Sequence, residues 1–190
     1  LALALALNIA RRIPQADRHV REGKWPQAPM PLATKMSGAR MGLVGIGRIG
    51  QAIAARALAF GMTIAYTARS AKPALPYAFH ATPQALAAAS DFLVVITPGG
   101  AATRKMIDAS VLQALGPKGF LINVARGSVV DEAALIDALQ RGVIAGAALD
   151  VFENEPNVPE ALRALDNVVL TPHIGSATQA TRQAMADRAF

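Results

Sequence analysis

The chain has 190 residues, of which 53% are hydrophobic and 17% are charged, and it has no cysteine. This composition is typical of one globular domain, excludes disulfides and thiolate metal sites, and suits a reducing compartment, so we expect a cytoplasmic protein without a bound metal. The formal net charge of +6 does not by itself indicate a nucleic-acid partner, because the Lys and Arg residues are scattered and few aromatic residues lie among them.

The first residues of the chain are apolar, but they predict neither a membrane span nor a signal peptide. Residues 1–7 are too short to cross a bilayer, and their basic neighbours follow them, whereas a signal peptide carries its positive charge in front. Alternating Leu and Ala favour a helix over residues 1–10, since both are strong helix formers. Residues 23–37, rich in Pro, Lys and Gln, predict an irregular connection. We therefore divide the chain into an N-terminal helix and arm (1–36) and a core (37–190).

From residue 41 onward, short β-rich runs alternate with Ala-rich helical patterns, which predicts right-handed βαβ units and an α/β fold with a doubly wound parallel sheet. The strands are expected at residues 41–44, 62–66, 92–96, 120–124, 143–149 and 168–170. The helices are expected at residues 49–60, 84–89, 131–142 and 178–190. Gly61 supplies a left-handed stop for the first of these helices, and Thr82 with Pro83 supplies an N-cap and a first-turn proline for the second.

Residues 45–50 fit the pattern G-x-G-x-x-G, which is typical of the phosphate-binding turn of a Rossmann domain. The pattern follows a predicted strand and opens a predicted helix, as that turn requires. Gly45 permits the tight turn, Gly47 lets the backbone approach a pyrophosphate, and Gly50 lets the helix pack on the strand. The helix N-terminus then faces the anion. A tight turn without a ligand is the alternative.

The residues after the second strand favour NADP over NAD. An NAD site usually carries Asp or Glu about 20 residues beyond the glycines, where the carboxylate accepts from the ribose 2′-hydroxyl. Here Arg69 and Ser70 occupy that region and can donate to a 2′-phosphate. The alternative is that Arg69 is a solvated surface residue.

Polar residues that follow the apolar strands are candidates for chemistry, since ligands gather at the carboxyl ends of the strands in such a sheet. Arg126 can bind a carboxylate, and His173 can exchange the proton that accompanies hydride transfer to a carbonyl. Asp150 and Glu155 follow another strand, and a carboxylate beside the imidazole would fix its tautomer. Each has an alternative interpretation: a cap of a carbonyl group for Arg126, a position in a solvated turn for Glu155, and a hydrogen-bonded loop residue for His173. His19 and His80 lack comparable surroundings.

These motifs resemble those of the D-isomer-specific 2-hydroxyacid dehydrogenase family. The resemblance is carried, in order and separation, by residues 42–50, 123–127, 149–156 and 171–176. Residues 16–18 and 21–25 are similar to the helix and arm that precede the cofactor domain in this family. The resemblance implies a Rossmann core with an N-terminal interdomain helix and arm, and a homodimer built through the cofactor domain.

The resemblance also implies the roles of the site residues. Arg126 orients a 2-oxo acid, His173 is the acid/base, and Glu155 hydrogen-bonds the imidazole. The cofactor, NADP or NAD, is expected to contact Gly45, Gly47, Arg48, Ile49, Gly50, Arg69, Ser70, Thr97, Val124, Ala125, Arg126, Asp150, His173, Gly175 and Ser176. Arg69 and Ser70 resemble the NADPH-preferring glyoxylate and hydroxypyruvate reductase branch, which implies a small 2-oxo acid as substrate.

The sequence departs from the family pattern in two respects. Residues 97–100 replace the more usual loop that contains leucine and threonine. The family's N-terminal substrate-domain segment and its C-terminal return helix have no counterpart in these 190 residues, so we expect this chain to bind the cofactor but to turn over substrate poorly alone. A cofactor-sensing corepressor of the same fold is the alternative to an enzyme, because such proteins keep the same Arg, Glu and His.

Overall fold

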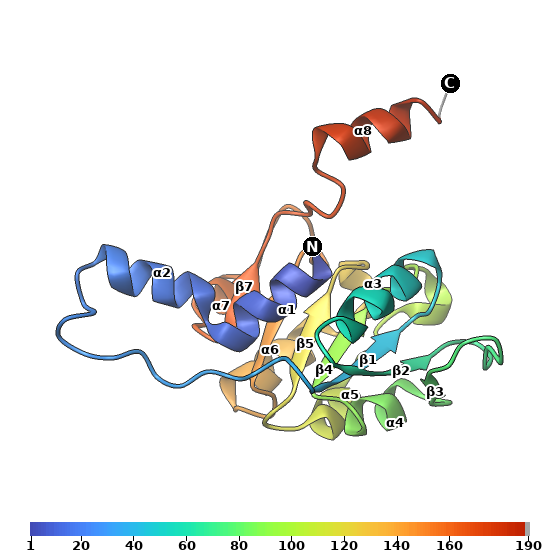
Figure 1. Ribbon diagram of the computed structural model, residues 1–190, viewed down its shortest axis with the longest axis horizontal. Coiled ribbons are helices and arrows are strands. Elements are labelled where there is room, and N and C mark those ends of the chain that lie inside the picture. The colour runs from blue at the N-terminus through green and yellow to red at the C-terminus, as the bar shows by residue number, and fades with distance from the viewer. Residues whose placement is uncertain (189–190) are drawn as a thin grey trace.

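The computed structural model describes residues 1–188 and contains one sheet of seven parallel strands (Figure 1). The strands are β1 (Arg40–Val44), β2 (Thr63–Thr67), β3 (Ala78–Phe79), β4 (Phe92–Val95), β5 (Phe120–Asn123), β6 (Gly146–Leu149) and β7 (Val168–Leu170). Their order is β3-β2-β1-β4-β5-β6-β7, so the chain runs outward from β1 and then returns to its other side. This confirms the doubly wound Rossmann-type sheet, and the direction reverses between β1 and β4, where ligands bind in such folds.

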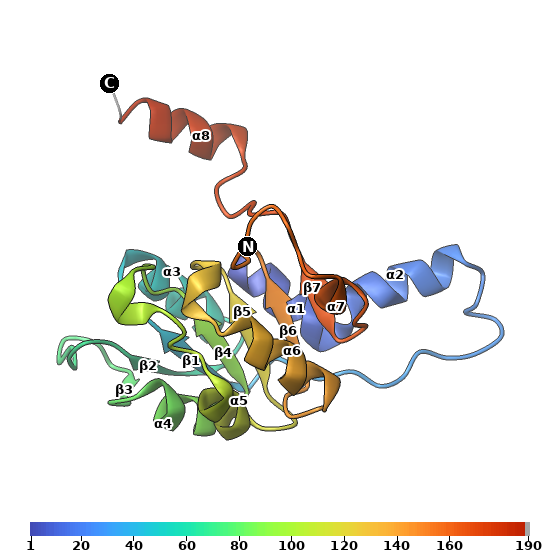
Figure 2. The same cartoon turned by 180° about the vertical axis from the view of Figure 1, so that it is seen from behind.

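Helices cover both faces of the sheet (Figures 1 and 2). One face carries α1 (Ala2–Arg11) and α3 (Arg48–Leu58), and the other carries α4 (Pro83–Ala88), α5 (Ala109–Leu115) and α6 (Glu132–Gln140). The short elements are η1 (Ala101–Thr103), η2 (Gly127–Val129) and α7 (Glu160–Arg163). Every residue of β4, β5 and β6 is buried, because these strands have a helical layer on each side.

Among the α-helices of residues 1–188, α2 (Ile13–Arg21) and α8 (Gln179–Ala186) have no buried residues and stand away from the sheet (Figures 1 and 2). Residues 22–39 form no helix or strand, as predicted for the arm. The first helix ends where Arg12 adopts a left-handed conformation with φ of 54°, and a second helix follows it, which the sequence analysis did not predict. Within residues 1–188, no helix is both long and apolar enough to cross a membrane.

Most predicted elements agree with the structure to within two residues, but one strand was predicted too long. Residues 143–145 belong to the turn after α6, since the Val143 N–H donates to the Ala138 carbonyl at 2.8 Å, and β6 starts only at Gly146. The predicted helix 178–190 begins at Gln179, after Thr178 as N-cap, and ends at Ala186, while residues 189 and 190 lie outside the described part of the chain. The elements β3, α5 and α7 were not predicted.

Candidate active site

The glycine turn joins β1 to α3 and leaves an open approach to the helix N-terminus. Gly45 has φ of +107°, a conformation that residues with a side chain rarely adopt. A Cβ on Gly50 would lie 2.5 Å from the Gly45 carbonyl oxygen, so this glycine is needed for close packing of helix and turn. A Cβ on Gly47 would meet nothing within 4 Å, and no side chain caps α3 there. The open space at Gly47 and the uncapped N–H groups fit a pyrophosphate.

A hollow of about 420 Å³ lies in front of this turn. Its lining includes residues 45–50 and, from the segment after β2, Arg69, Ser70 and Lys72. Arg48 adds a further positive charge, and no carboxylate lines the hollow. In the described part of the chain, none of the three cations takes part in a salt bridge. The hollow therefore offers uncompensated positive charge to a phosphorylated ligand.

A second hollow, of about 640 Å³, continues from the first. The two share Ile49, Ile96, Thr97 and Pro98, and the second is closed by the loop after β5 with Val124, Ala125 and Arg126. The structure thus brings together most of the residues predicted to bind the cofactor, at the carboxyl edge of the sheet. This end of the sheet is where ligands bind in doubly wound folds, and the individual cofactor contacts stay predictions.

The loop that carries Arg126 is held by Asn123, a buried polar residue that was not among the predicted site residues. The Asn123 amide accepts from the Ala125 N–H at 3.1 Å and donates to the Arg126 carbonyl at 3.1 Å. Arg126 itself is exposed, and its Nη1–H donates to the Ala125 carbonyl at 2.6 Å. A Cβ on Gly127 would lie 1.9 Å from the Phe152 carbonyl, so the loop packs directly on the segment after β6. A polar residue at the end of an apolar strand was the available signal for Asn123.

Glu155 and His173 lie in contact, although 18 residues separate them in the sequence. The distance from His173 Nδ1 to Glu155 Oε2 is 2.7 Å, and Glu155 Oε1 accepts from the Phe152 N–H at 3.0 Å. An ionised carboxylate can only accept, so the Nδ1–H of His173 donates to it. This fixes the tautomer of the neutral ring and leaves Nε2 as the nitrogen that can exchange a proton with a ligand.

Glu155 is ionised at neutral pH because its hydrogen bonds and nearby charges favour the carboxylate form. Partial burial alone would raise the pKa of its carboxyl group. Hydrogen bonds from His173 and the Phe152 N–H, together with the charges of His173 and Arg126, outweigh burial and bring the pKa of Glu155 below its ordinary value. Arg126 donates to the Ala125 carbonyl, and among the described residues it has no hydrogen bond to Glu155 or His173.

Asp150 holds the loop that carries His173. Its carboxylate, in a residue only 1% exposed, accepts from the Thr171 hydroxyl at 2.6 Å and from the N–H groups of Ile174 and Gly175 at 2.8 and 2.9 Å. His173 has φ of 52°, a left-handed conformation that is uncommon for a residue with a side chain. The three hydrogen bonds hold the loop in this conformation. The predicted contact of Asp150 with the nicotinamide stays a prediction.

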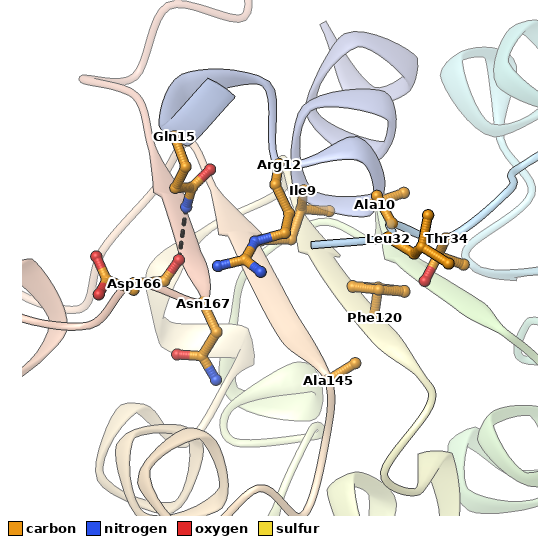
Figure 3. Close-up of a pocket in the computed structure, with 11 residues that line it drawn as sticks. Ile9, Ala10, Arg12, Gln15, Leu32, Thr34, Phe120, Ala145, Asp166 and Asn167 are labelled. Atoms are coloured by element: carbon orange, nitrogen blue, oxygen red, sulfur yellow. Dashed lines mark hydrogen bonds between the residues drawn. The ribbon is translucent and has the colours of Figure 1, made fainter. Parts of the chain in front are cut away.

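Another hollow, of about 300 Å³, lies at the opposite edge of the sheet and contains none of the predicted site residues (Figure 3). Gln15 and Asp166 border it, and the Gln15 side chain donates to the Asp166 carbonyl at 2.6 Å. His19 lies near this edge and pairs with the Ala28 carbonyl at 2.9 Å, so it ties the arm to α2. The chemistry-bearing groups are at the carboxyl ends of the strands, and we place the candidate active site there.

The sequence model of a protein family, described as the D-isomer specific 2-hydroxyacid dehydrogenase, NAD binding domain, matches residues 3–175 of the chain. The chain belongs to the D-isomer specific 2-hydroxyacid dehydrogenase family. This confirms the resemblance that the four sequence motifs carry.

Several proteins similar to this chain are named as reductases. Glyoxylate/hydroxypyruvate reductase A of Arabidopsis thaliana is 53% identical, over 98% of this chain and 60% of that protein. The 2-ketogluconate reductase of Gluconobacter oxydans (strain 621H) is 48% identical over the same shares. The crystal structure of an NADPH-dependent glyoxylate/hydroxypyruvate reductase of Sinorhizobium meliloti, in complex with NADP and malonate, is 54% identical with a TM-score of 0.94, over 98% of this chain and 59% of that chain. The chain thus spans about 60% of the length of the relatives it matches.

Proposed function

We propose that this chain is the cofactor-binding and catalytic part of an NADPH-dependent reductase that converts small 2-oxo acids, such as glyoxylate or hydroxypyruvate, to D-2-hydroxy acids. The observation that carries the proposal is the Glu155–His173 pair, which lies at the same sheet edge as the glycine turn and Arg126. A dinucleotide site alone would fit many enzymes. A histidine polarised by a carboxylate and an exposed arginine at the carboxyl end of the same sheet fit a substrate that has both a carbonyl and a carboxylate.

Arg126 binds the substrate carboxylate and orients the adjacent carbonyl group. Nε2 of His173 protonates the carbonyl oxygen, while the Glu155 carboxylate accepts from Nδ1 and holds the ring in place. Bound NADPH supplies the hydride that C2 of the acid receives. In the reverse direction the same Nε2 removes the hydroxyl proton.

The remaining predicted contacts lie partly along the two hollows and partly in the segments that follow β6 and β7, where Asp150, His173, Gly175 and Ser176 are found. Gly45, Gly47, Arg48, Ile49 and Gly50 bind the pyrophosphate through backbone and side chain, since they surround the open N-terminus of α3. The nicotinamide side of the site is formed by Thr97, Val124, Ala125, Arg126, Asp150, His173, Gly175 and Ser176.

NADP is preferred to NAD in this proposal because Arg69 and Ser70 line the first hollow and no carboxylate does. The NADP found in the Sinorhizobium meliloti relative supports the preference. We further propose that the protein acts in the cytoplasm as a homodimer built through the cofactor domain. Sedimentation of the chain tests the dimer.

The test of the proposed activity is NADPH oxidation with a panel of 2-oxo acids, measured on this chain together with the segments that complete its relatives. We expect turnover of glyoxylate and hydroxypyruvate. Tight NADPH binding without turnover of any 2-oxo acid would contradict the enzyme and favour a cofactor-sensing corepressor. The names of the relatives favour the enzyme.

A further inference from the structure

The segment that follows β2 is held by a buried tyrosine hydroxyl. Tyr66 lies on β2 and is 1% exposed, with its ring centroid 5.5 Å from that of Phe79. Its hydroxyl oxygen accepts from the Lys72 N–H at 2.7 Å and lies 3.5 Å from the Lys72 carbonyl oxygen, to which it donates. The chain from residue 67 to residue 72 is therefore closed into a loop, with both ends fastened to the same strand.

This loop presents its polar residues to the hollow in front of the glycine turn. Arg69, Ser70 and Lys72 all line that hollow, opposite Gly47 and Arg48. Tyr66 is not itself among the lining residues, so the hydroxyl acts on the hollow only through the loop. Lys72 is exposed and, within the described residues, has no salt-bridge partner.

Positive charge borders the hollow at the glycine turn and also at the segment after β2. The glycine turn already offers the N–H groups of α3 to the pyrophosphate, and Arg48 lies beside them. Arg69 and Lys72 add two positive charges on the β2 side, where the ribose of the adenosine lies in Rossmann domains. A guanidinium fork and a compact ammonium charge together suit a phosphate dianion, which NADP carries on this ribose and NAD does not.

We propose that Lys72 is a second cationic ligand of the 2′-phosphate beside Arg69, and that Tyr66 is the positioning residue that holds Lys72 toward it. The inference rests on the proposed function, since it assumes that the hollow takes NADP. Because the loop is fastened before the ligand arrives, less conformational freedom is lost on binding. The hydroxyl of Tyr66 thereby contributes to the choice between the two dinucleotides without touching either of them.

The experiment titrates the chain with NADPH and with NADH and compares their dissociation constants in two variants. Lys72→Gln removes the charge, and we expect the Kd for NADPH to rise about tenfold while the Kd for NADH changes less than about twofold. Tyr66→Phe keeps the buried ring but leaves the Lys72 N–H without its acceptor, and we expect a rise of about three- to fivefold for NADPH alone. The matched control for Lys72 is Lys118→Gln, at an exposed lysine just before β5, at the amino ends of the strands. The matched control for Tyr66 is Tyr77→Phe, at the second tyrosine of the chain.

The ratio of the Kd for NADPH to the Kd for NADH separates a loss of Lys72 positioning from a general loss of structure. A Tyr66→Phe variant that weakens both dinucleotides equally would overturn the positioning role, and an unchanged NADPH Kd in Lys72→Gln would overturn the role of Lys72. Lys72 is exposed, so its variant tests the proposal even where Tyr66→Phe fails to fold. Failure of the unmodified chain to bind either dinucleotide would overturn the proposed function and this inference with it. Normal binding with unchanged selectivity in both variants would overturn this inference alone.

Discussion

The carboxylate of Glu155 lies 2.7 Å from Nδ1 of His173, and this contact fixes which ring nitrogen faces the substrate side. A Glu155→Gln change keeps the size of the side chain but removes the charge. In this chain together with the segments that complete its relatives, we expect kcat for glyoxylate to fall about 100-fold, because the protonated ring is no longer stabilised, while the Kd for NADPH is unchanged. Glu153→Gln is the control, since Glu153 pairs instead with Arg104. Equal losses in the two variants would contradict the assigned role.

The glycines of the turn should separate into one needed for binding and one needed for folding. A Cβ on Gly47 has open space and φ there is −73°, so Gly47→Ala should leave the melting temperature unchanged while it lowers dinucleotide affinity about tenfold or more. A Cβ on Gly50 would meet the Gly45 carbonyl oxygen at 2.5 Å, so Gly50→Ala should lower the melting temperature as well. Thermal unfolding and NADPH titration of both variants check this, and full affinity in Gly47→Ala would count against the predicted approach of the pyrophosphate.

Asp150 should matter for stability as well as for activity. Asp150→Ala removes the acceptor of three hydrogen bonds in a residue that is 1% exposed, so we expect a loss of about 2–4 kcal/mol in the free energy of unfolding. Asp137→Ala, in an exposed pair with Arg141, should cost less than about 0.5 kcal/mol. Denaturant unfolding measures both. Similar losses in the two variants would show that the buried hydrogen bonds of Asp150 stabilise the fold no more than an exposed ion pair does.

Asp91 predicts a dependence of stability on pH. Its carboxylate accepts from the side chain and the backbone N–H of Arg40, and these contacts lower the pKa of Asp91 despite the opposing effect of burial. Because the pKa is lower in the folded state, the unfolded chain takes up the proton first as the pH falls. The stabilisation is therefore present above the ordinary aspartate pKa of 3.8 and is lost as the pH falls through the lower folded value.

Asp91→Asn tests this linkage. Because the Arg40–Asp91 pair is partly exposed and solvent screens it, we expect the free energy of unfolding at pH 7 to fall by less than about 1 kcal/mol, with the difference from the unmodified chain shrinking as the pH falls below about 4. Urea unfolding at a series of pH values measures it. Asp17→Asn, in an exposed pair with Arg21, serves as the control with little effect at any pH. A difference that grows at acid pH would contradict the sign.

The parts of the fold that local rules determine could be predicted from the sequence. Thr82 accepts from the Ala85 N–H at 3.1 Å as the expected N-cap, and Gly61 has the expected positive φ of 69°. The element α5 was missed although Asp108 caps it in the same way, through the N–H groups of Ser110 and Val111. An Asp before an apolar helical pattern is a typical N-cap, so the start of α5 could have been predicted from the sequence.

Other features have no local signal. The strand β3 has two residues and, within residues 1–188, pairs only with β2, so it depends on the sheet that is already present. The contact between Glu155 and His173 joins segments on either side of α7 and β7, and no spacing rule fixes such a distance. The same holds for the hydrogen bond from the Lys72 N–H to the Tyr66 hydroxyl. A tyrosine in an apolar strand is predicted to be a core residue, and the sequence does not show which group its hydroxyl contacts.

The central claim is that His173 performs the proton transfer of a 2-oxo acid reductase, and its most direct test is the His173→Ala variant in this chain together with the segments that complete its relatives. We expect kcat for glyoxylate to fall by about 1,000-fold or more while the Kd for NADPH stays within about twofold of the unmodified protein. Turnover that is retained in the variant, or a loss of NADPH affinity that accounts for the lost turnover, would contradict the claim.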